Sequence, residues 1–268
     1  MFEAILKYTF LQNALIAALL CAILCGLIGV ILSEKKMLMM SGGIAHTAYG
    51  GVGLGFLLGF EPIFTAGIFA VISALIIGFV RRKNGVHTDI IISLLWSLGM
   101  ACGVLFTTLM PSFPPDMNSY LFGNILTVTK SDLLIMAVVT LIVLFAVILL
   151  FNDWKAFLFD GQFCTVSGIK TAFLEYLLLI LTALSIVVLI RVVGIILVIA
   201  LLSAPSACAV FSSKTLSIRM CLAGILSFIF CFIGLSFSYY LGIASGASIV
   251  FVSVLTYFLL LLLKKIKS

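Results

Sequence analysis

The chain is organised around residues 42–59, which read Gly42-Gly43-Ile44-Ala45-His46-Thr47-Ala48-Tyr49-Gly50-Gly51-Val52-Gly53-Leu54-Gly55-Phe56-Leu57-Leu58-Gly59. This stretch is apolar enough to lie in a bilayer, yet it contains seven glycines and one histidine. Glycine inside a helix costs about 0.5–1 kcal/mol relative to alanine, but in membranes small residues let neighbouring helices approach closely. An ionisable side chain within a spanning segment is a functional-site hypothesis by default. We therefore look for the substrate path here.

The composition indicates a membrane protein. Of the 268 residues, 64% are hydrophobic and only 9% are charged, and the mean hydropathy is +1.41. Soluble domains carry about 25% charged residues. No polar stretch is long enough for a separate soluble domain, so we predict an all-α polytopic membrane protein whose residues 1–268 form a single transmembrane domain.

Nine segments are long and apolar enough to span a bilayer, which takes about 20 residues. They cover residues 12–32, 37–60, 62–80, 90–110, 131–151, 172–190, 193–211, 219–241 and 244–263. Only Arg191-Val192 separates the segments 172–190 and 193–211, which are both short. A count of eight spans, with one of these two broken or re-entrant, stays open.

The placement of lysine and arginine predicts the orientation, because cytoplasmic loops are enriched in them. If the loop Arg81-Arg82-Lys83 is cytoplasmic and nine spans alternate, 12 of the 15 basic residues lie inside. Lys7, Lys130 and Arg191 remain outside. This distribution predicts an outer N-terminus and an inner C-terminus. It also explains the net charge of +6 without any binding of nucleic acid.

Two connections are longer than a turn. The outer one, residues 111–131, begins with three prolines, which forbid a regular helix there, and it contains Asp116. This carboxylate either collects a cation or caps the short helix that follows. Ser131-Asp132 is expected to cap the next span.

The inner connection, residues 152–171, is expected to form a short amphipathic helix that ends at Gly168. Such a helix on the cytoplasmic surface would suit the docking of another protein. The residues that we assign to this docking segment are Phe159, Asp160, Gln162, Phe163 and Gly168.

Within the spans, His46 is the main candidate for contact with a metal or another substrate, since neutral imidazole is a common ligand of transition metals. The alternative is a histidine that bonds to a neighbouring helix and only supports packing. Gly50, Gly51 and Gly53 are expected to pack a neighbouring helix closely. Pro205 should kink its span, and the freed carbonyl groups could line a path.

No covalent chemistry is indicated. The chain has no phosphate-binding G-x-x-x-x-G-K-[ST] motif and no Ser/His/Asp or H-E-x-x-H set. The seven cysteines lie mostly in apolar runs without paired C-x-x-C spacing, so neither a disulfide framework nor a thiolate metal site is expected. Uphill transport would need energy from a partner or from an ion gradient.

Several short motifs follow one another along the chain in a specific order. Lys35-Lys36 precedes Ser41-Gly42-Gly43-Ile44-Ala45-His46, and Asp116 precedes Tyr120-Leu121-Phe122-Gly123. Further motifs are Val193-Gly194-Ile195-Ile196-Leu197-Val198 with Ala204-Pro205-Ser206-Ala207, and Ser238-Tyr239-Tyr240 with Ser245-Gly246-Ala247. Together they make the chain similar, nearly end to end, to the permease subunits of ABC importers for zinc, manganese and iron.

The resemblance implies a permease that binds no cofactor of its own and transports a divalent metal across the cytoplasmic membrane of a prokaryote. It implies a dimer of permeases, cytoplasmic ATP-binding subunits and an extracytoplasmic metal-binding protein as partners. His46 then matches the histidine of the intramembrane metal path, which we extend to Asp116. The segment 159–169 matches the part that docks on the ATPase.

Two positions depart from the family pattern. Gly42 replaces an aspartate four residues before the histidine, and Gly242 replaces an acidic residue after Tyr239-Tyr240. A borderline ion such as zinc tolerates the loss of an oxygen ligand better than manganese does, so zinc is the expected cargo, with manganese or iron also possible. The alternatives are an ABC permease for a non-metal solute, an ion-gradient secondary transporter and a purely structural subunit.

Overall fold

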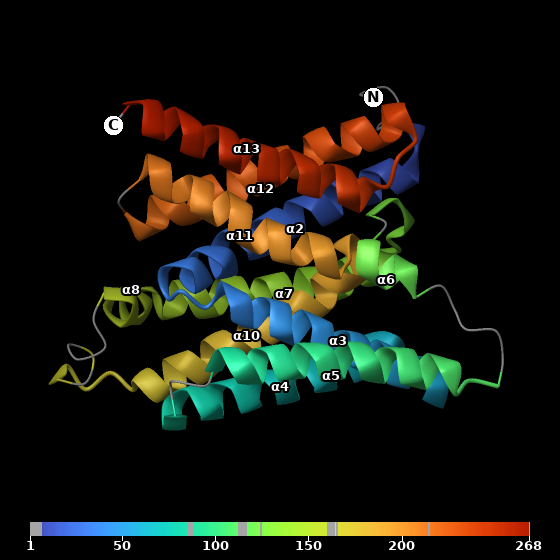
Figure 1. Cartoon of the computed structure of the whole chain (residues 1–268). Helices are drawn as coiled ribbons and strands as arrows, with labels where there is room; N and C mark the ends of the chain where they lie inside the picture. The colour runs from blue at the N-terminus through green and yellow to red at the C-terminus, as the bar shows by residue number, and fades with distance from the viewer. Residues whose placement is uncertain are drawn as a thin grey trace.

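The computed structural model describes residues 7–84, 88–111, 117–123, 125–159, 164, 166–213 and 215–267, and the regular structure in these residues is entirely helical (Figure 1). The long helices are α2 (Thr9–Glu34), α3 (Leu38–Leu58), α4 (Pro62–Asn84), α5 (Thr88–Thr108), α7 (Lys130–Leu149), α10 (Thr171–Val193), α11 (Ile195–Ser212), α12 (Leu216–Leu241) and α13 (Ser245–Lys267). Three short elements connect them: α6 (Asn118–Phe122), the 3-10 helix η2 (Ile125–Thr127) and α8 (Phe151–Phe159).

The long helices confirm the prediction of an all-α polytopic membrane protein. Each one coincides with a predicted span, and eight of those in the described ranges are apolar enough by length and composition to cross a membrane. The exception is α3, whose glycines, hydroxyl side chains and His46 lower its hydropathy. Most residues of α3 are nevertheless buried, so neighbouring helices shield the polar groups that lipid would not tolerate.

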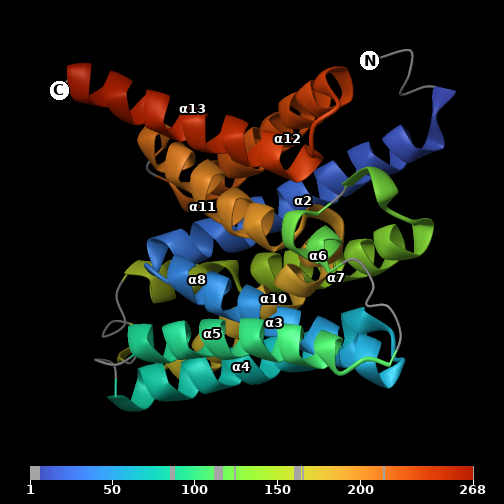
Figure 2. The same ribbon diagram turned by 45° about the vertical axis from the view of Figure 1, so that its right-hand side comes forward.

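The helices pack in two groups on either side of α2 (Figures 1 and 2). On one side, α3 lies between α4 and α5, and α10 packs against α4. On the other side, α12 packs against α2 and α13, and α11 contacts α2, α12 and α13. In the most apolar 18-residue stretch of each helix, the buried share is 67% in α2 and 72% in α10, but only 17% in α5 and 22% in α13. The apolar outer faces of α5 and α13 are therefore left for lipid or for another protein.

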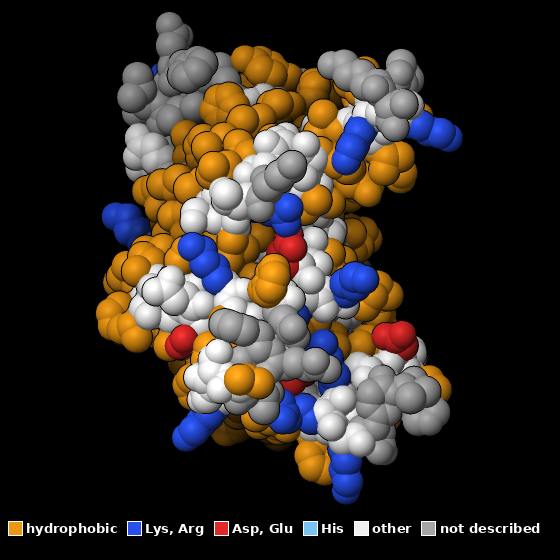
Figure 3. Space-filling view, turned by 90° about the vertical axis from the view of Figure 1, so that its left-hand side faces the viewer, with side chains coloured by type: hydrophobic (Ala, Val, Ile, Leu, Met, Phe, Trp, Pro, Cys, Tyr) orange, Lys and Arg blue, Asp and Glu red, His pale blue; other side chains and the backbone are white. Residues whose placement is uncertain are grey.

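The two ends of the bundle differ in charge. Successive long helices alternate in direction, so the chain begins at one end and finishes at the other (Figure 1). We call the end where α2, α4, α7, α11 and α13 finish the basic end, and Figure 3 views the molecule from this side. Its lysines and arginines include Lys35, Lys36, Arg81, Arg82, Lys83, Lys155, Lys170, Arg219, Lys264 and Lys265.

A sharp turn at Gly194 separates α10 from α11, which removes the alternative of one broken segment. Gly194 has φ 80° and ψ 161°, a conformation that is essentially restricted to glycine. The chain therefore reverses within one residue, and both helices remain complete. Pro205 lies buried inside α11, and a kink at this residue stays a prediction.

The start of α7 differs by a residue or two from the predicted cap. The N-cap is Thr129, and Asp132 occupies the third helical position of a capping box. The Thr129 amide and hydroxyl donate to the Asp132 carboxylate at 3.0 and 2.7 Å. The prediction that Ser131-Asp132 forms the N-cap is therefore wrong, because the threonine hydroxyl begins the helix earlier.

The packing of α3 on α4 predicts the effect of adding one methyl group. A Cβ atom at Gly51 would lie 2.5 Å from the Thr65 carbonyl oxygen and 2.7 Å from the Ala66 Cα atom, whereas Gly67 on α4 has open space. We expect Gly51→Ala to lower the free energy of unfolding by about 1–3 kcal/mol. Gly67→Ala should raise it by about 0.5 kcal/mol through helix propensity. Thermal unfolding in detergent compares the two variants, and a shift in the same direction would contradict this account.

Candidate functional site

His46 lies on α3 with only 9% of its surface exposed. Its imidazole stacks on the indole of Trp96 from α5, with 4.0 Å between ring centroids and 15° between ring planes. The Nδ1 atom is buried and has no hydrogen-bond partner among the described residues. A buried nitrogen without a partner is costly in a folded protein, so this atom calls for a partner such as a water molecule or an ion.

Gly42 lies one helical turn before His46 and faces the same indole. A Cβ atom at Gly42 would be 3.1 Å from Trp96 Cζ3 and 3.7 Å from the Ile199 Cδ1 atom of α11. The candidate site therefore lies where α3, α5 and α11 meet. Trp96 covers both positions on α3.

Close packing of α3 against α5 fixes this arrangement. A Cβ atom at Gly99 would lie 2.4 Å from the His46 carbonyl oxygen, and one at Gly50 would lie 2.8 Å from the Gly99 carbonyl oxygen. The Thr47 hydroxyl reaches the carbonyl groups of Gly43 at 2.7 Å and of Leu95, on α5, at 3.2 Å. The two backbones thus touch directly, which sets the register of Trp96 over His46.

Gly53 belongs to the same contact between α3 and α5. A Cβ atom there would lie 2.8 Å from the Gly103 carbonyl oxygen. Gly99 and Gly103 are four residues apart, a spacing that lets two membrane helices approach. Sequence reasoning missed Trp96, and this pair of glycines was the signal that could have placed α5 beside α3.

The described residues contain no group of three His, Cys, Asp or Glu side chains that could hold a metal ion. Of the predicted path residues, only His46 is described, because Asp116 lies outside the described residues. A site with one imidazole suits brief contact with a passing ion better than a closed structural metal centre, which in the case of zinc has four ligands.

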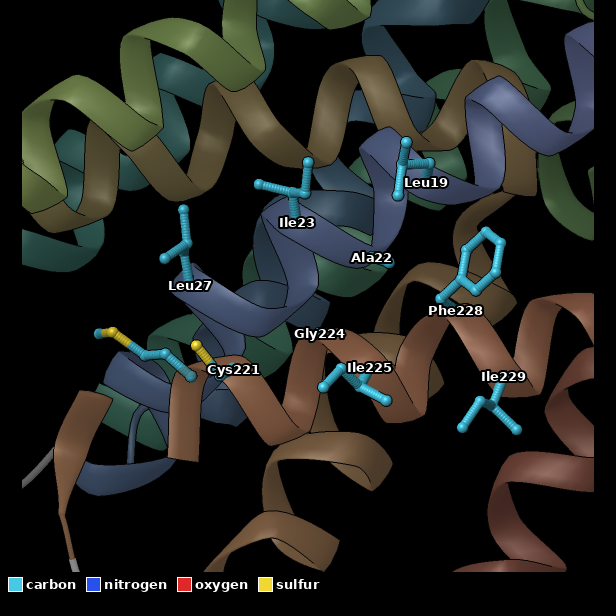
Figure 4. Close-up of a pocket in the computed structure, with 10 residues that line it drawn as sticks. Leu19, Ala22, Ile23, Leu27, Cys221, Gly224, Ile225, Phe228 and Ile229 are labelled. Atoms are coloured by element: carbon cyan, nitrogen blue, oxygen red, sulfur yellow. The ribbon is translucent and has the colours of Figure 1, made fainter. Parts of the chain in front are cut away.

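An apolar cavity between α2 and α12 is a poor place for a cation. It measures about 410 Å³ and is lined by residues such as Leu19, Ile23 and Leu27 from α2 and Phe228 and Ile229 from α12 (Figure 4). Apart from the sulfur atoms of Met220 and Cys221, the lining side chains supply carbon surface without oxygen or nitrogen ligands. The cavity is therefore separate from the candidate site.

The predicted docking segment is described only in part. Asp160, Gln162 and Phe163 lie outside the described residues. Phe159 ends α8 and is 89% exposed. Gly168 is left-handed with φ 73°, and the Ile169 amide donates to the Cys164 carbonyl group at 2.9 Å, a hydrogen-bond pattern that closes a helix.

Helix α8, before this segment, anchors it to the basic end. Trp154 and Phe157 of α8 are buried, and the indole Nε1 atom of Trp154 donates to the Ala146 carbonyl group of α7 at 3.4 Å. The Lys35 Nζ atom lies 3.7 Å from the centre of the Phe157 ring. The sequence predicted a helix within residues 152–171 that ends at Gly168. Helix α8 covers Phe151–Phe159 and so ends before that glycine, with Trp154 and Phe157 buried.

Two ion-pair clusters were missed by the sequence analysis. At the basic end, Glu175 of α10 pairs with Arg81 at 3.4 Å and with Arg82 at 3.2 Å. In the sequence analysis, these arginines served only to identify a cytoplasmic loop. The signal was an acidic residue in the first turns of an otherwise apolar span, which needs a partner.

At the opposite end, Arg191 pairs with Glu61 and with Asp132, each at 3.2 Å, and donates to the Tyr120 hydroxyl oxygen at 3.3 Å. Burial raises the pKa of the Tyr120 phenol, so this group stays neutral. Arg191 thus ties α10 to α6, to α7 and to Glu61 directly before α4, beside a polar cavity of about 210 Å³.

Three sequence motifs meet beside this cluster. A Cβ atom at Gly123 would lie 2.1 Å from the Val193 carbonyl carbon, and one at Gly194 would lie 2.3 Å from the Gly123 nitrogen. A Cβ atom at Gly246 would lie 2.1 Å from the Phe122 carbonyl oxygen. We call Gly123, Gly194 and Gly246 the glycine contact. Segments far apart in sequence therefore touch through backbone atoms.

Comparison with known families gives a direct match. The ABC 3 transport family matches residues 7–264. The chain belongs to this family. The resemblance to ABC importer permeases that the motifs indicated is thereby confirmed.

This ABC 3 protein is similar along nearly its whole length to other membrane proteins. It is 38% identical to the uncharacterized membrane protein slr2045 of Synechocystis sp., covering 97% of this chain and 92% of the relative. It is 35% identical to the manganese transport system membrane protein MntC of Halalkalibacterium halodurans, covering 94% and 86%. Its fold matches that of PsaBC from Streptococcus pneumoniae, solved in complex with Fab, with a TM-score of 0.87, 29% identity and coverage of 97% and 93%.

Proposed function

We propose that this ABC 3 protein is the permease subunit of an importer that moves a divalent transition-metal ion across the cytoplasmic membrane of a prokaryote. The observation that carries the proposal is the buried His46 Nδ1 atom, which has no hydrogen-bond partner among the described residues. His46 lies on α3, the central helix of the group formed by α3, α4 and α5. A relative named as part of a manganese transport system supports a metal as cargo.

Zinc is the first candidate cargo, and manganese and iron are the alternatives. Imidazole nitrogen suits zinc and iron, whereas manganese prefers carboxylate, carbonyl and water oxygens. Gly42 supplies no carboxylate one turn from His46. The name of the Halalkalibacterium relative favours manganese instead, so the experiment follows all three ions.

The transport cycle that we propose is alternating access by a dimer of permeases. The basic end faces the cytoplasm, which puts the N-terminus outside and the C-terminus inside. An extracytoplasmic binding protein delivers the ion, which then passes His46. Cytoplasmic ATPase subunits dock on residues 159–169, next to the anchored helix α8, and ATP hydrolysis on these partners drives the change. This chain itself carries out no covalent reaction.

The test is uptake of zinc, manganese and iron in cells that express the permease with its ATPase, comparing wild type with His46→Ala. We expect the uptake of one metal to fall by about tenfold or more, as is typical when a group that supports a metal site is removed. Ser93→Ala is the control, because Ser93 lies on the exposed face of α5 and its hydroxyl donates to the Asp89 and Ile90 carbonyl groups of the same helix.

Membrane insertion of each variant is checked by blot. Unchanged uptake of every metal by His46→Ala would remove His46 from the path and move the search to Asp116 and Pro205.

Gly42 favours a second candidate function, an ABC permease for a non-metal solute. In that case, no metal would be taken up above the level of cells without the permease.

A further inference from the structure

The indole of Trp96 lies against two positions of α3, His46 and Gly42. Its indole stacks on His46, and its Cζ3 atom would lie 3.1 Å from a Cβ atom at Gly42. A Cβ atom at position 42 would therefore press on the indole that covers the imidazole, and a larger side chain would need the indole to shift further. The size of the residue at position 42 and the position of the Trp96 indole over His46 therefore depend on each other.

We propose that Gly42 and Trp96 together determine which ion is accepted at His46. This inference rests on the proposed function of His46 as a ligand of the transported ion. The indole fills the space that a carboxylate at position 42 would need, so the ion meets one nitrogen ligand and an aromatic surface. The site selects a borderline divalent cation, such as Zn²⁺ or Fe²⁺, and disfavours the harder Mn²⁺.

The helices around His46 offer no carboxylate in its place. Helices α3 and α11 contain no Asp or Glu at all. The only acidic residue of α5 is Asp89 in its first turn, about two helical turns before Trp96. Within these three helices, therefore, the oxygen ligands that a hard cation prefers are absent near the imidazole.

The position of the indole is held by the backbone contact between α3 and α5. Gly99 lies against the His46 carbonyl group, and the Thr47 hydroxyl reaches the Leu95 carbonyl group at 3.2 Å. Leu95 and Gly99 flank Trp96 on α5. This contact keeps α3 and α5 in register, so we expect a carboxylate at position 42 to be accommodated by a movement of the indole and not by a shift of the helices.

The experiment compares Gly42→Asp, the double variant Gly42→Asp/Trp96→Ala and the matched control Gly42→Ala/Trp96→Ala in the uptake assay with Zn²⁺ and Mn²⁺. The control opens the same space without adding a carboxylate. We expect Gly42→Asp alone to lower uptake of both ions and to reduce thermal stability in detergent. The acidic double variant should recover stability, and its ratio of Mn²⁺ to Zn²⁺ uptake should exceed that of the control by about tenfold.

Equal ratios in the acidic double variant and its control would overturn the inference, as would a Gly42→Asp variant that is as stable and active as wild type. His46→Ala in the same assay separates this failure from failure of the proposed function. If His46→Ala loses uptake while the ratios stay equal, only the role of Gly42 and Trp96 is wrong. If His46→Ala transports normally, the proposed metal path is wrong as well.

Discussion

Replacing Gly194 with alanine is expected to lower the free energy of unfolding by about 4 kcal/mol, because strain in the backbone and overpacking add together. Gly194 has φ 80° and ψ 161°, which an alanine adopts only under strain. The added Cβ atom would also lie 2.3 Å from the Gly123 nitrogen and 2.5 Å from the Phe122 carbonyl carbon. Both are backbone atoms, so no flexible side chain can move aside.

The measurement is thermal or denaturant unfolding of the purified permease in detergent, together with the yield of folded protein. Gly242→Ala is the matched control. Gly242 is also left-handed, with φ 66°, but it has open space around a Cβ atom. This control should lose only about 1–2 kcal/mol, the cost of a left-handed conformation alone. If both variants lose the same stability, neither the close contacts nor the backbone conformation of Gly194 costs more than the αL conformation of Gly242.

Replacing Glu175 with alanine is expected to cost about 2 kcal/mol, less than the loss typical of a fully buried ion pair because both arginines are partly exposed. The Glu175 side chain is 11% exposed, accepts a hydrogen bond from Arg82 at 3.2 Å and forms an ion pair with Arg81 at 3.4 Å. Its removal leaves two cations at the junction of α4 and α10 without this counter-ion. The stability is measured as above, at low and at high salt.

Glu61→Ala is the control for this second experiment. Glu61 also pairs with an arginine, but its side chain is 55% exposed, and Arg191 keeps Asp132 as a partner. The control should therefore change stability by less than about 1 kcal/mol, as exposed pairs do. A Glu175→Ala variant as stable as Glu61→Ala would mean that water compensates the two arginines fully.

The sequence predicted the fold well because apolar segments of spanning length alternate with short polar loops, so hydropathy and length together locate the helices. Predicted spans such as 62–80 and 219–241 agree within a few residues with α4 and α12. The basic residues also gather at one end of the bundle, as their spacing predicted. The start of α7 was missed by a residue or two, since Thr129 caps it through a side-chain bond that hydropathy does not register.

The candidate site was predicted only as far as one residue. His46 stood out because an ionisable side chain within an apolar span is rare. Trp96, in contrast, looked like any apolar residue of its span, and Arg191 looked like a loop charge. Their roles depend on partners that are distant in the sequence: Trp96 on Gly42 and His46, and Arg191 on Glu61 and Asp132.

The sequence by itself determined the all-α class, the approximate ends of the long helices and the charge difference between the two ends of the bundle, but it left the count of spans at eight or nine. Only the tertiary structure decided which helix faces meet, and so which residues cover His46 and which glycines touch. The physical reason is that lipid and protein interior are both apolar, so the hydropathy of a spanning helix does not mark its packed face. Shape decides that face, and close contacts such as Gly123 on Gly194 exist only once the helices have packed.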